Sequence, residues 1–122
     1  MTFFLPLRVL VTLLLFVPVL VFSAEQHVAY QITNRHIEAK PPTLKVKQGD
    51  TLVIAWRSDE AVSLHLHGYD VLIKLAPSIP GHMKLTAHSL GRFPVSAHGF
   101  GTEQHAKRHA EIAMMYLEVL PK

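Results

Sequence analysis

The sequence predicts an all-β fold: an antiparallel Greek-key β-sandwich preceded by a signal peptide. About eight short stretches alternate apolar and polar residues, turn residues separate them at regular spacing, and no stretch has the period of a long helix. Such a series of short strands is typical of antiparallel sandwiches and barrels. No internal repeat and no linker divides the chain after residue 24, so we expect a single domain at 25–122.

Residues 1–24 have the composition of a secretory signal peptide. Arg8 is their only charged side chain, the run 9–22 is apolar apart from one threonine, and small residues, Ser23 and Ala24, end it. The apolar run is shorter than the roughly 20 residues that a membrane-spanning helix needs. An uncleaved membrane anchor is the alternative. We therefore expect a periplasmic or secreted protein. Cleavage after Ser23 or Ala24 would release it from the membrane.

The first half of the domain contains strands that alternate apolar and polar side chains. The first covers 28–33, the second 44–47, and the turn Gln48-Gly49-Asp50 leads into a third at 51–56. The third strand is β-branched, apolar and aromatic, which is typical of a buried strand. A polar turn then separates it from the central strand at 62–67.

The second half continues the same pattern. Strands are predicted at 70–75, 83–88, 92–97 and 114–120. Their apolar faces consist of Met83, Leu85, Ala87, Phe93, Val95, Ala97, Met115, Leu117 and Val119. The segment 98–111 breaks the alternation, which indicates a polar loop or a short helix.

Charge and composition exclude several function classes. The formal net charge of +3 is too small for a nucleic-acid binder, and no basic stripe with interleaved aromatic residues is present. The chain has no cysteine, so neither a disulfide nor a thiolate metal ligand is available. No nucleophile–base pair, paired carboxylate or phosphate-binding loop appears, so we do not expect an enzyme. Nine histidines favour metal binding, because histidine is the commonest metal ligand.

The prediction of a metal site depends mainly on one motif in the central strand. It is Leu64-His65-Leu66-His67, followed by Gly68-Tyr69-Asp70. Residues two apart in a strand point to the same face. We therefore expect the two leucines to face the core and the two histidines to face away from it together. Two imidazoles side by side on a strand form half of a metal site. The alternative is a pair of solvated histidines.

Four stretches, taken in this order, resemble the cupredoxins, which are copper-binding Greek-key sandwiches. They are the turn and strand at 46–56 with its tryptophan, the His-x-His-Gly motif at 65–68, the Gly-x-Phe strand at 91–95, and the last strand at 116–119. The His-x-His-Gly piece also looks like a copper motif of multicopper oxidases. The resemblance covers most of residues 43–120 and implies the fold, copper as the metal, and export.

The resemblance also implies where metal ligands would lie. The family takes one histidine from the middle of the chain, here His65 or His67, and further ligands from the loop before the last strand. The family's cysteine would fall four residues after Phe93, where this chain has Ala97. The thiolate that makes copper sites blue is therefore absent, and the resemblance supports the fold more than it supports electron transfer.

The candidate metal ligands are five histidines: His65, His67, His98, His105 and His109. Imidazole without thiolate suits Cu(II) and leaves Zn as an alternative. Glu103 and Glu111 are candidate partners that orient the imidazoles. Met114 and Met115 are core residues or soft ligands, and we expect His36, His82 and His88 at the surface.

We therefore expect an exported copper-binding protein that sequesters or delivers copper, or otherwise serves copper homeostasis. A copper-donating or copper-receiving periplasmic protein would be its partner. The alternatives are an interaction or structural sandwich whose histidines bind nothing and, third, a copper electron carrier. Cleavage after Ala24 would place His27 third in the mature chain, where a free amine, two backbone amides and the imidazole could form a second, planar copper site.

Overall fold

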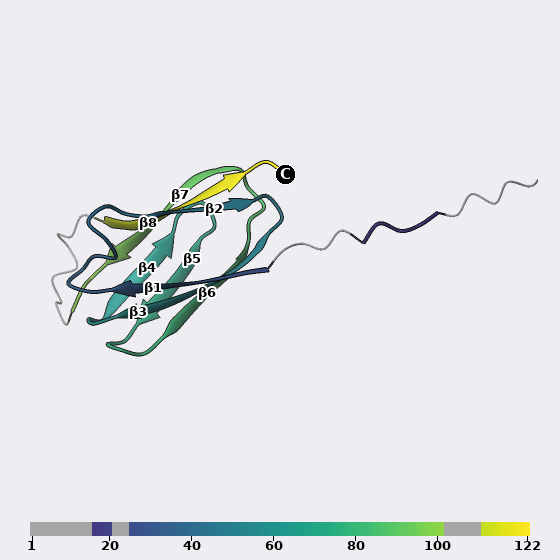
Figure 1. The fold of residues 1–122 in the computed structure, drawn as a ribbon. Helices are drawn as coiled ribbons and strands as arrows, with labels where there is room; N and C mark the ends of the chain where they lie inside the picture. The colour runs from purple at the N-terminus through teal and green to yellow at the C-terminus, as the bar shows by residue number, and fades with distance from the viewer. Residues whose placement is uncertain (1–15, 21–24, 102–110) are drawn as a thin grey trace, which may run out of the picture.

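Eight strands form the described part of the chain, which comprises residues 16–20, 25–101 and 111–122 of a computed structural model (Figure 1). They are β1 (Glu25–Ile32), β2 (Thr43–Lys47), β3 (Thr51–Ser58), β4 (Val62–Leu66), β5 (Val71–Leu75), β6 (Gly81–Thr86), β7 (Gly91–His98) and β8 (Ile112–Leu120). Each strand predicted from the alternation is present. The largest differences are at β1 and β8, which begin earlier than predicted, at β3, which ends two residues later, and at β6, which is displaced by two residues toward the N-terminus.

The strands form two sheets that face each other, as the prediction of a sandwich requires. One sheet has the order β1-β3-β6 and the other has the order β2-β8-β7-β4-β5. Strands that are neighbours in sequence, such as β1 and β2 or β5 and β6, belong to different sheets. At these connections the chain crosses from one sheet to the other, as it does in a Greek-key sandwich.

The pairing is not antiparallel throughout. The pairs β1–β3 and β2–β8 are parallel, whereas β3–β6, β4–β5, β4–β7 and β7–β8 are antiparallel. The parallel pairs follow from the crossings, because a chain that leaves one sheet and returns to it can run in the same direction twice. Alternation along the sequence carries no information about strand direction, so it could not have predicted this feature.

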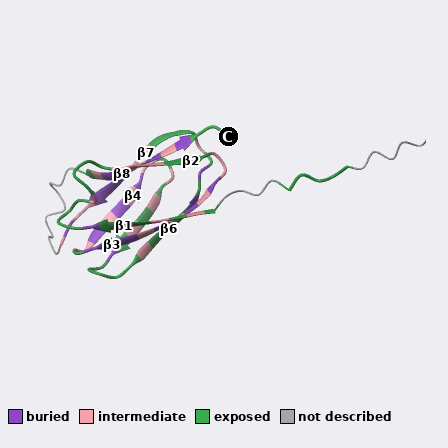
Figure 2. Ribbon diagram, in the orientation of Figure 1, coloured by how far each residue is buried: buried purple, intermediate pink, exposed green. Residues whose placement is uncertain are grey.

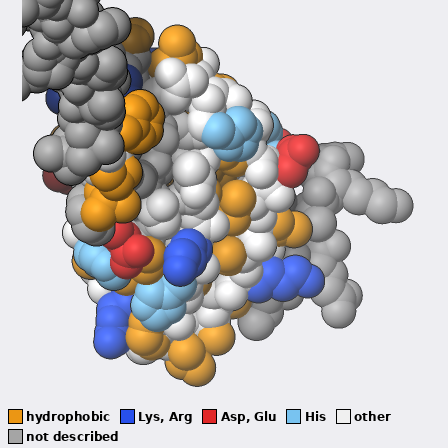
Figure 3. Space-filling view, turned by 90° about the vertical axis from the view of Figure 1, so that its right-hand side faces the viewer, with side chains coloured by type: hydrophobic (Ala, Val, Ile, Leu, Met, Phe, Trp, Pro, Cys, Tyr) orange, Lys and Arg blue, Asp and Glu red, His pale blue; other side chains and the backbone are white. Residues whose placement is uncertain are grey.

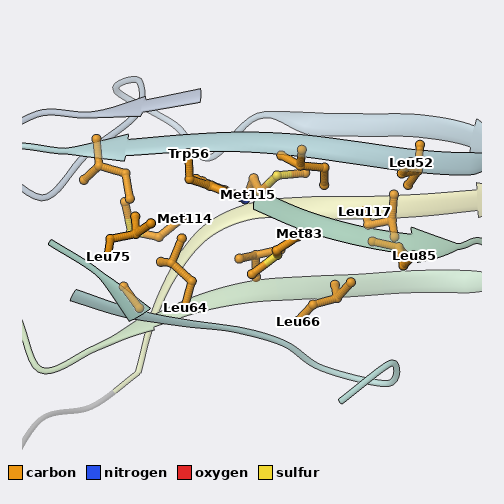
Figure 4. Packing of buried hydrophobic residues seen from close by; sticks show 14 of the residues in the cluster. Leu52, Trp56, Leu64, Leu66, Leu75, Met83, Leu85, Met114, Met115 and Leu117 are labelled. Atoms are coloured by element: carbon orange, nitrogen blue, oxygen red, sulfur yellow. The ribbon is translucent and has the colours of Figure 1, made fainter. Parts of the chain in front are cut away.

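Apolar side chains from both sheets fill the space between the layers (Figure 4). Strands of both sheets carry buried residues (Figure 2). Trp56 of β3 is fully buried, and Leu64 and Leu66 of β4 are 0% exposed. Met83, Met115 and Leu117 complete the centre of the cluster (Figure 4). The predicted inward parity is therefore confirmed on the central strand and on the last three strands.

A tight turn after β4 fixes where the central strand ends. Gly68 has φ +82°, a conformation that side chains rarely adopt, and Asp70 has φ +52°. Between them, the Tyr69 ring packs edge-on against Phe93, with 5.0 Å between centroids and an interplanar angle of 85°. The Tyr69 hydroxyl donates to the Ser89 carbonyl oxygen at 2.9 Å and accepts from the Ser89 N–H at 3.0 Å. These contacts hold the turn against the neighbouring strand.

Most of the predicted signal peptide lies outside the described residues, and export stays a prediction. Residues 16–20 carry no regular secondary structure, and their large apolar side chains are exposed. In the part of the chain that the structure describes, no helix has the length and apolarity required to cross a bilayer.

The buried position of Leu64 on β4 and the exposed position of Leu72 on β5 predict a large difference in stability between two alanine variants. Leu64→Ala should lower the free energy of unfolding by about 2–5 kcal/mol, because it removes a fully buried side chain from the core. The matched control, Leu72→Ala on β5, should cost only about 0.5 kcal/mol, since Leu72 is 60% exposed. Urea denaturation followed by tryptophan fluorescence measures both. An equal loss of stability in the two variants would contradict the assignment of Leu64 to the core and Leu72 to the surface.

The turn after β4 gives a second prediction, with two glycines compared. A Cβ at Gly68 would clash with the Phe93 ring, whereas a Cβ at Gly99, which also has positive φ, would meet nothing within 4 Å. Both alanine variants carry the backbone strain, but only Gly68→Ala adds the steric cost of about 1–3 kcal/mol. The measurement is the free energy of unfolding of each variant. A Gly68→Ala variant as stable as Gly99→Ala would show that the turn does not depend on this close approach.

Candidate metal centre

His65 and His67 lie on the outer face of the five-stranded sheet. Leu64 and Leu66 alternate with them into the core, so the predicted division of this strand is confirmed. His67 follows the last residue of β4, and its N–H donates to the Pro94 carbonyl oxygen at 3.0 Å. That hydrogen bond continues the pairing with β7 for one more residue, so His67 still points to the same side as His65.

His98 is the last residue of β7 and reaches the same face from the neighbouring strand. In the antiparallel register, His65 lies opposite Ser96, and Ser63 lies opposite His98. His98 is therefore the diagonal neighbour of His65, a relation that spans about 7–8 Å and lies within reach of long side chains. A register shift between Val95 and Ser96, where β7 pairs with β8, precedes this end of β7.

The three histidines converge. One ring nitrogen from each of His65, His67 and His98 lies within 4.8 Å of the others. The ring centroids of His65 and His67 are 4.3 Å apart, and those of His65 and His98 are 6.3 Å apart. All three side chains are partly exposed, so the cluster is supported by the sheet and accessible to solvent.

The Nε2 atom of His67 has an unusual environment. This atom is buried, and no hydrogen-bond partner satisfies it. Glu111 Oε2 lies 2.9 Å from it, but the pair does not have the directionality of a hydrogen bond. Since a buried polar atom usually has a partner, an unsatisfied ring nitrogen beside two other imidazoles fits a ligand atom that a metal ion would satisfy.

Carboxylates lie beside each imidazole of the cluster. The two oxygens of Glu111 approach two rings, Oε2 at 2.9 Å from His67 Nε2 and Oε1 at 3.4 Å from His98 Nε2. Asp70 Oδ1 lies 3.8 Å from His65 Nε2, and this aspartate is almost fully exposed. The cluster therefore combines three imidazoles with nearby carboxylates, and such a set of nitrogen and oxygen donors suits a metal cation.

An open pocket borders the cluster. Its volume is about 490 Å³, and its lining consists of Ser63, His65, Asp70, Leu72 and His98. The pocket lies over β4, β5 and the end of β7, and it gives an ion or a small ligand access to His65 and His98 from solvent.

The structure brings together three of the five predicted ligands, and ligation by them stays a prediction. His105 and His109 lie outside the described residues, as does Glu103. The three described histidines come from β4, from the residue that follows β4, and from the end of β7. They meet over the outer face of the sheet, because the register with β7 places His98 beside the first half of β4.

No soft ligand joins the described histidines. Met114 and Met115 are buried among the core side chains between the two sheets, which confirms their interpretation as core residues (Figure 4). Ala97, at the position of the family's cysteine, is 2% exposed and also points into the core.

The remaining described histidines are separate from the cluster. His36, His82 and His88 are exposed, as predicted. His27 lies on β1, with its Nε2 at 2.8 Å from Glu25 Oε1, and it shares a shallow pocket of about 240 Å³ with His82 on the outer face of the other sheet. On the face drawn in Figure 3, histidines lie at more than one place, and charges of both signs are interspersed among apolar side chains.

Comparisons with known proteins identify the fold. No protein-family model and no curated protein match the sequence. Among solved structures, a copper nitrite reductase from Nitrosomonas europaea aligns with a TM-score of 0.59 and 18% identity over 80% of this chain and 42% of that chain. A blue copper oxidase from the same organism aligns with a TM-score of 0.58 and 15% identity, over 80% of this chain and 39% of that one.

A third structure is similar over almost its whole length. The periplasmic domain of subunit II of cytochrome oxidase from Bradyrhizobium japonicum aligns with a TM-score of 0.56 and 11% identity, over 83% of this chain and 88% of that chain. The chain spans less than two thirds of the first structures it matches. At these identities the similarity establishes the architecture alone, and the architecture is that of a cupredoxin-like β-sandwich.

Proposed function

We propose that this protein binds copper through His65, His67 and His98 and serves to sequester or deliver it outside the cytoplasm. The observation that carries the proposal is the convergence of the three ring nitrogens within 4.8 Å, one of the rings having a buried Nε2 without a hydrogen-bond partner. An ion held by these nitrogens would satisfy that atom. The predicted signal peptide supports a periplasmic or secreted location.

The donor set favours copper among the available metals. Imidazole suits Cu(II), Ni(II) and Zn(II), and in a given nitrogen and oxygen site Cu(II) generally binds more tightly than either of the others. The solved structures with this fold include copper proteins, which agrees with the same choice. Zinc remains the alternative ion, because it also accepts three histidines.

Binding rather than electron transfer or catalysis fits the residues present. A blue-copper centre needs a cysteine thiolate, and the chain has none. The described part of the site offers no nucleophile–base pair either. The open pocket beside His65 suits exchange of an ion with another protein, and Leu72, exposed at the edge of this pocket, is an apolar contact that such a copper-donating or copper-receiving partner would use.

The first test is a Cu(II) titration of histidine variants. Replacing both His65 and His67 by alanine should weaken Cu(II) binding by at least about 100-fold, because it removes two ligands. Replacing His98 alone should weaken it by about 10-fold, because it removes one. The matched controls, His36→Ala and His88→Ala, should bind like the wild type, since both residues are exposed and outside the cluster. Unchanged affinity in the double variant would overturn the proposal.

Two further arms of this titration assign the remaining predicted ligands. A His105→Ala/His109→Ala variant measures what the loop before the last strand contributes to Cu(II) affinity.

His27→Ala tests the alternative site at the mature N-terminus. That site requires that the exported chain begins at Glu25 and that the start of β1 releases its pairing with β3. N-terminal sequencing of the exported protein fixes the cleavage position. Retention of all bound copper in His27→Ala would exclude this second site.

The absence of sulfur ligands gives a spectroscopic prediction. The Cu(II) form should show only weak d–d absorption, because no thiolate is available for an intense sulfur-to-copper charge-transfer band. The measurement is the visible spectrum of the protein loaded with one equivalent of Cu(II). An intense blue or green charge-transfer band would contradict the assigned ligands.

A further inference from the structure

We infer that Glu111 is a fourth ligand of the ion and that it makes the site selective for Cu(II) over Cu(I). This inference rests on the proposed function and adds the oxidation state of the cargo. The carboxylate approaches the cluster with both oxygens, at 2.9 Å from His67 Nε2 and 3.4 Å from His98 Nε2.

We take Nε2 as the metal-binding nitrogen of His67, because it is the buried ring nitrogen that has no hydrogen-bond partner. A carboxylate that orients a metal-binding histidine contacts the ring nitrogen opposite the one that binds the metal. Glu111 instead contacts the Nε2 atoms, including the buried Nε2 of His67 that has no hydrogen-bond partner. An ion bound to that nitrogen would therefore lie on the same side of the ring as the carboxylate.

The fold holds Glu111 in this position through β8. Glu111 immediately precedes β8, and the β7–β8 register pairs Ala97 with Ile112, which places Glu111 next to His98 across the strands. Among the ion pairs of the described residues, the only partners of Glu111 are the two histidines. The carboxylate is thus supported by a paired strand and is not engaged by a lysine or arginine there.

The resulting donor set discriminates between the two oxidation states of copper. Three imidazoles and one carboxylate provide nitrogen and oxygen donors, which suit Cu(II), whereas thiolate and thioether ligands select Cu(I). The nearby methionines do not compensate, because Met114 and Met115 are buried between the sheets. The negative charge of Glu111 also stabilises a doubly charged ion more than a singly charged one.

The experiment measures both oxidation states in three forms of the full chain. Wild type, Glu111→Gln and the control Glu118→Gln are titrated with Cu(II) and, under reducing conditions, with Cu(I), in competition with chelators of known affinity. Glu118 lies near the far end of β8, so its variant makes the same change of charge away from the cluster. Thermal unfolding of all three proteins verifies that they fold alike.

Glu111→Gln should lower the Cu(II) affinity by about 10- to 100-fold and the Cu(I) affinity by less than about threefold. Each tenfold difference between the two losses raises the reduction potential of the bound copper by about 59 mV. The control Glu118→Gln should match the wild type in both titrations.

Other outcomes separate this inference from the proposed function. Equal losses for Cu(I) and Cu(II) would show that Glu111 orients the histidines for any ion, which overturns the inference. Unchanged Cu(II) affinity in Glu111→Gln would overturn it too, and in both cases copper binding by the wild type leaves the proposed function standing. A wild-type protein that binds neither ion would refute the proposed function itself.

Discussion

The register between β4 and β7 determines which histidines can meet. It places His65 opposite Ser96, so the diagonal position on the next strand belongs to His98. A shift of one residue would turn His98 toward the core and Ala97 toward solvent, because the faces of a strand alternate. Val95 and Ala97, which are buried on β7, oppose such a shift, since it would move them out of the core. The same core packing that stabilises the sandwich therefore fixes the geometry of the histidine cluster.

The cluster differs chemically from a blue-copper centre in ways that follow from its place on the fold. Its histidines project from the outer face of a sheet, whereas Ala97, Met114 and Met115 point into the core between the sheets. Sulfur is therefore separated from the described ligand atoms by the sheet itself. The candidate ligands that remain are imidazoles and the carboxylate of Glu111, in a region open to solvent. Such a region is suited to taking up and releasing an ion, which agrees with a role in copper sequestration or delivery.

The alternation of apolar residues was sufficient to predict eight strands, the sandwich and the inward faces, because burial in a two-layer fold follows a period of two. It could not predict that β1–β3 and β2–β8 are parallel, since strand direction depends on how the chain crosses between sheets. The pairing of His65 with His67 was predictable from their spacing. The approach of His98 and Glu111 was not, because it depends on the register of β4 with β7 and of β7 with β8. His105 and His109, which the resemblance suggested, lie outside the described residues and stay predictions.

The central claim, that copper binds over the outer face of β4 and β7, is tested most directly by NMR with paramagnetic Cu(II). Substoichiometric Cu(II) added to isotope-labelled protein broadens the resonances of nuclei near the ion, so the broadened residues locate the site without any substitution. We predict that the signals of His65, His67, His98 and Glu111 broaden first, whereas those of His36, His82 and His88 stay sharp. Broadening that begins at His27 on β1, or that spreads evenly over the exposed histidines, would contradict the account.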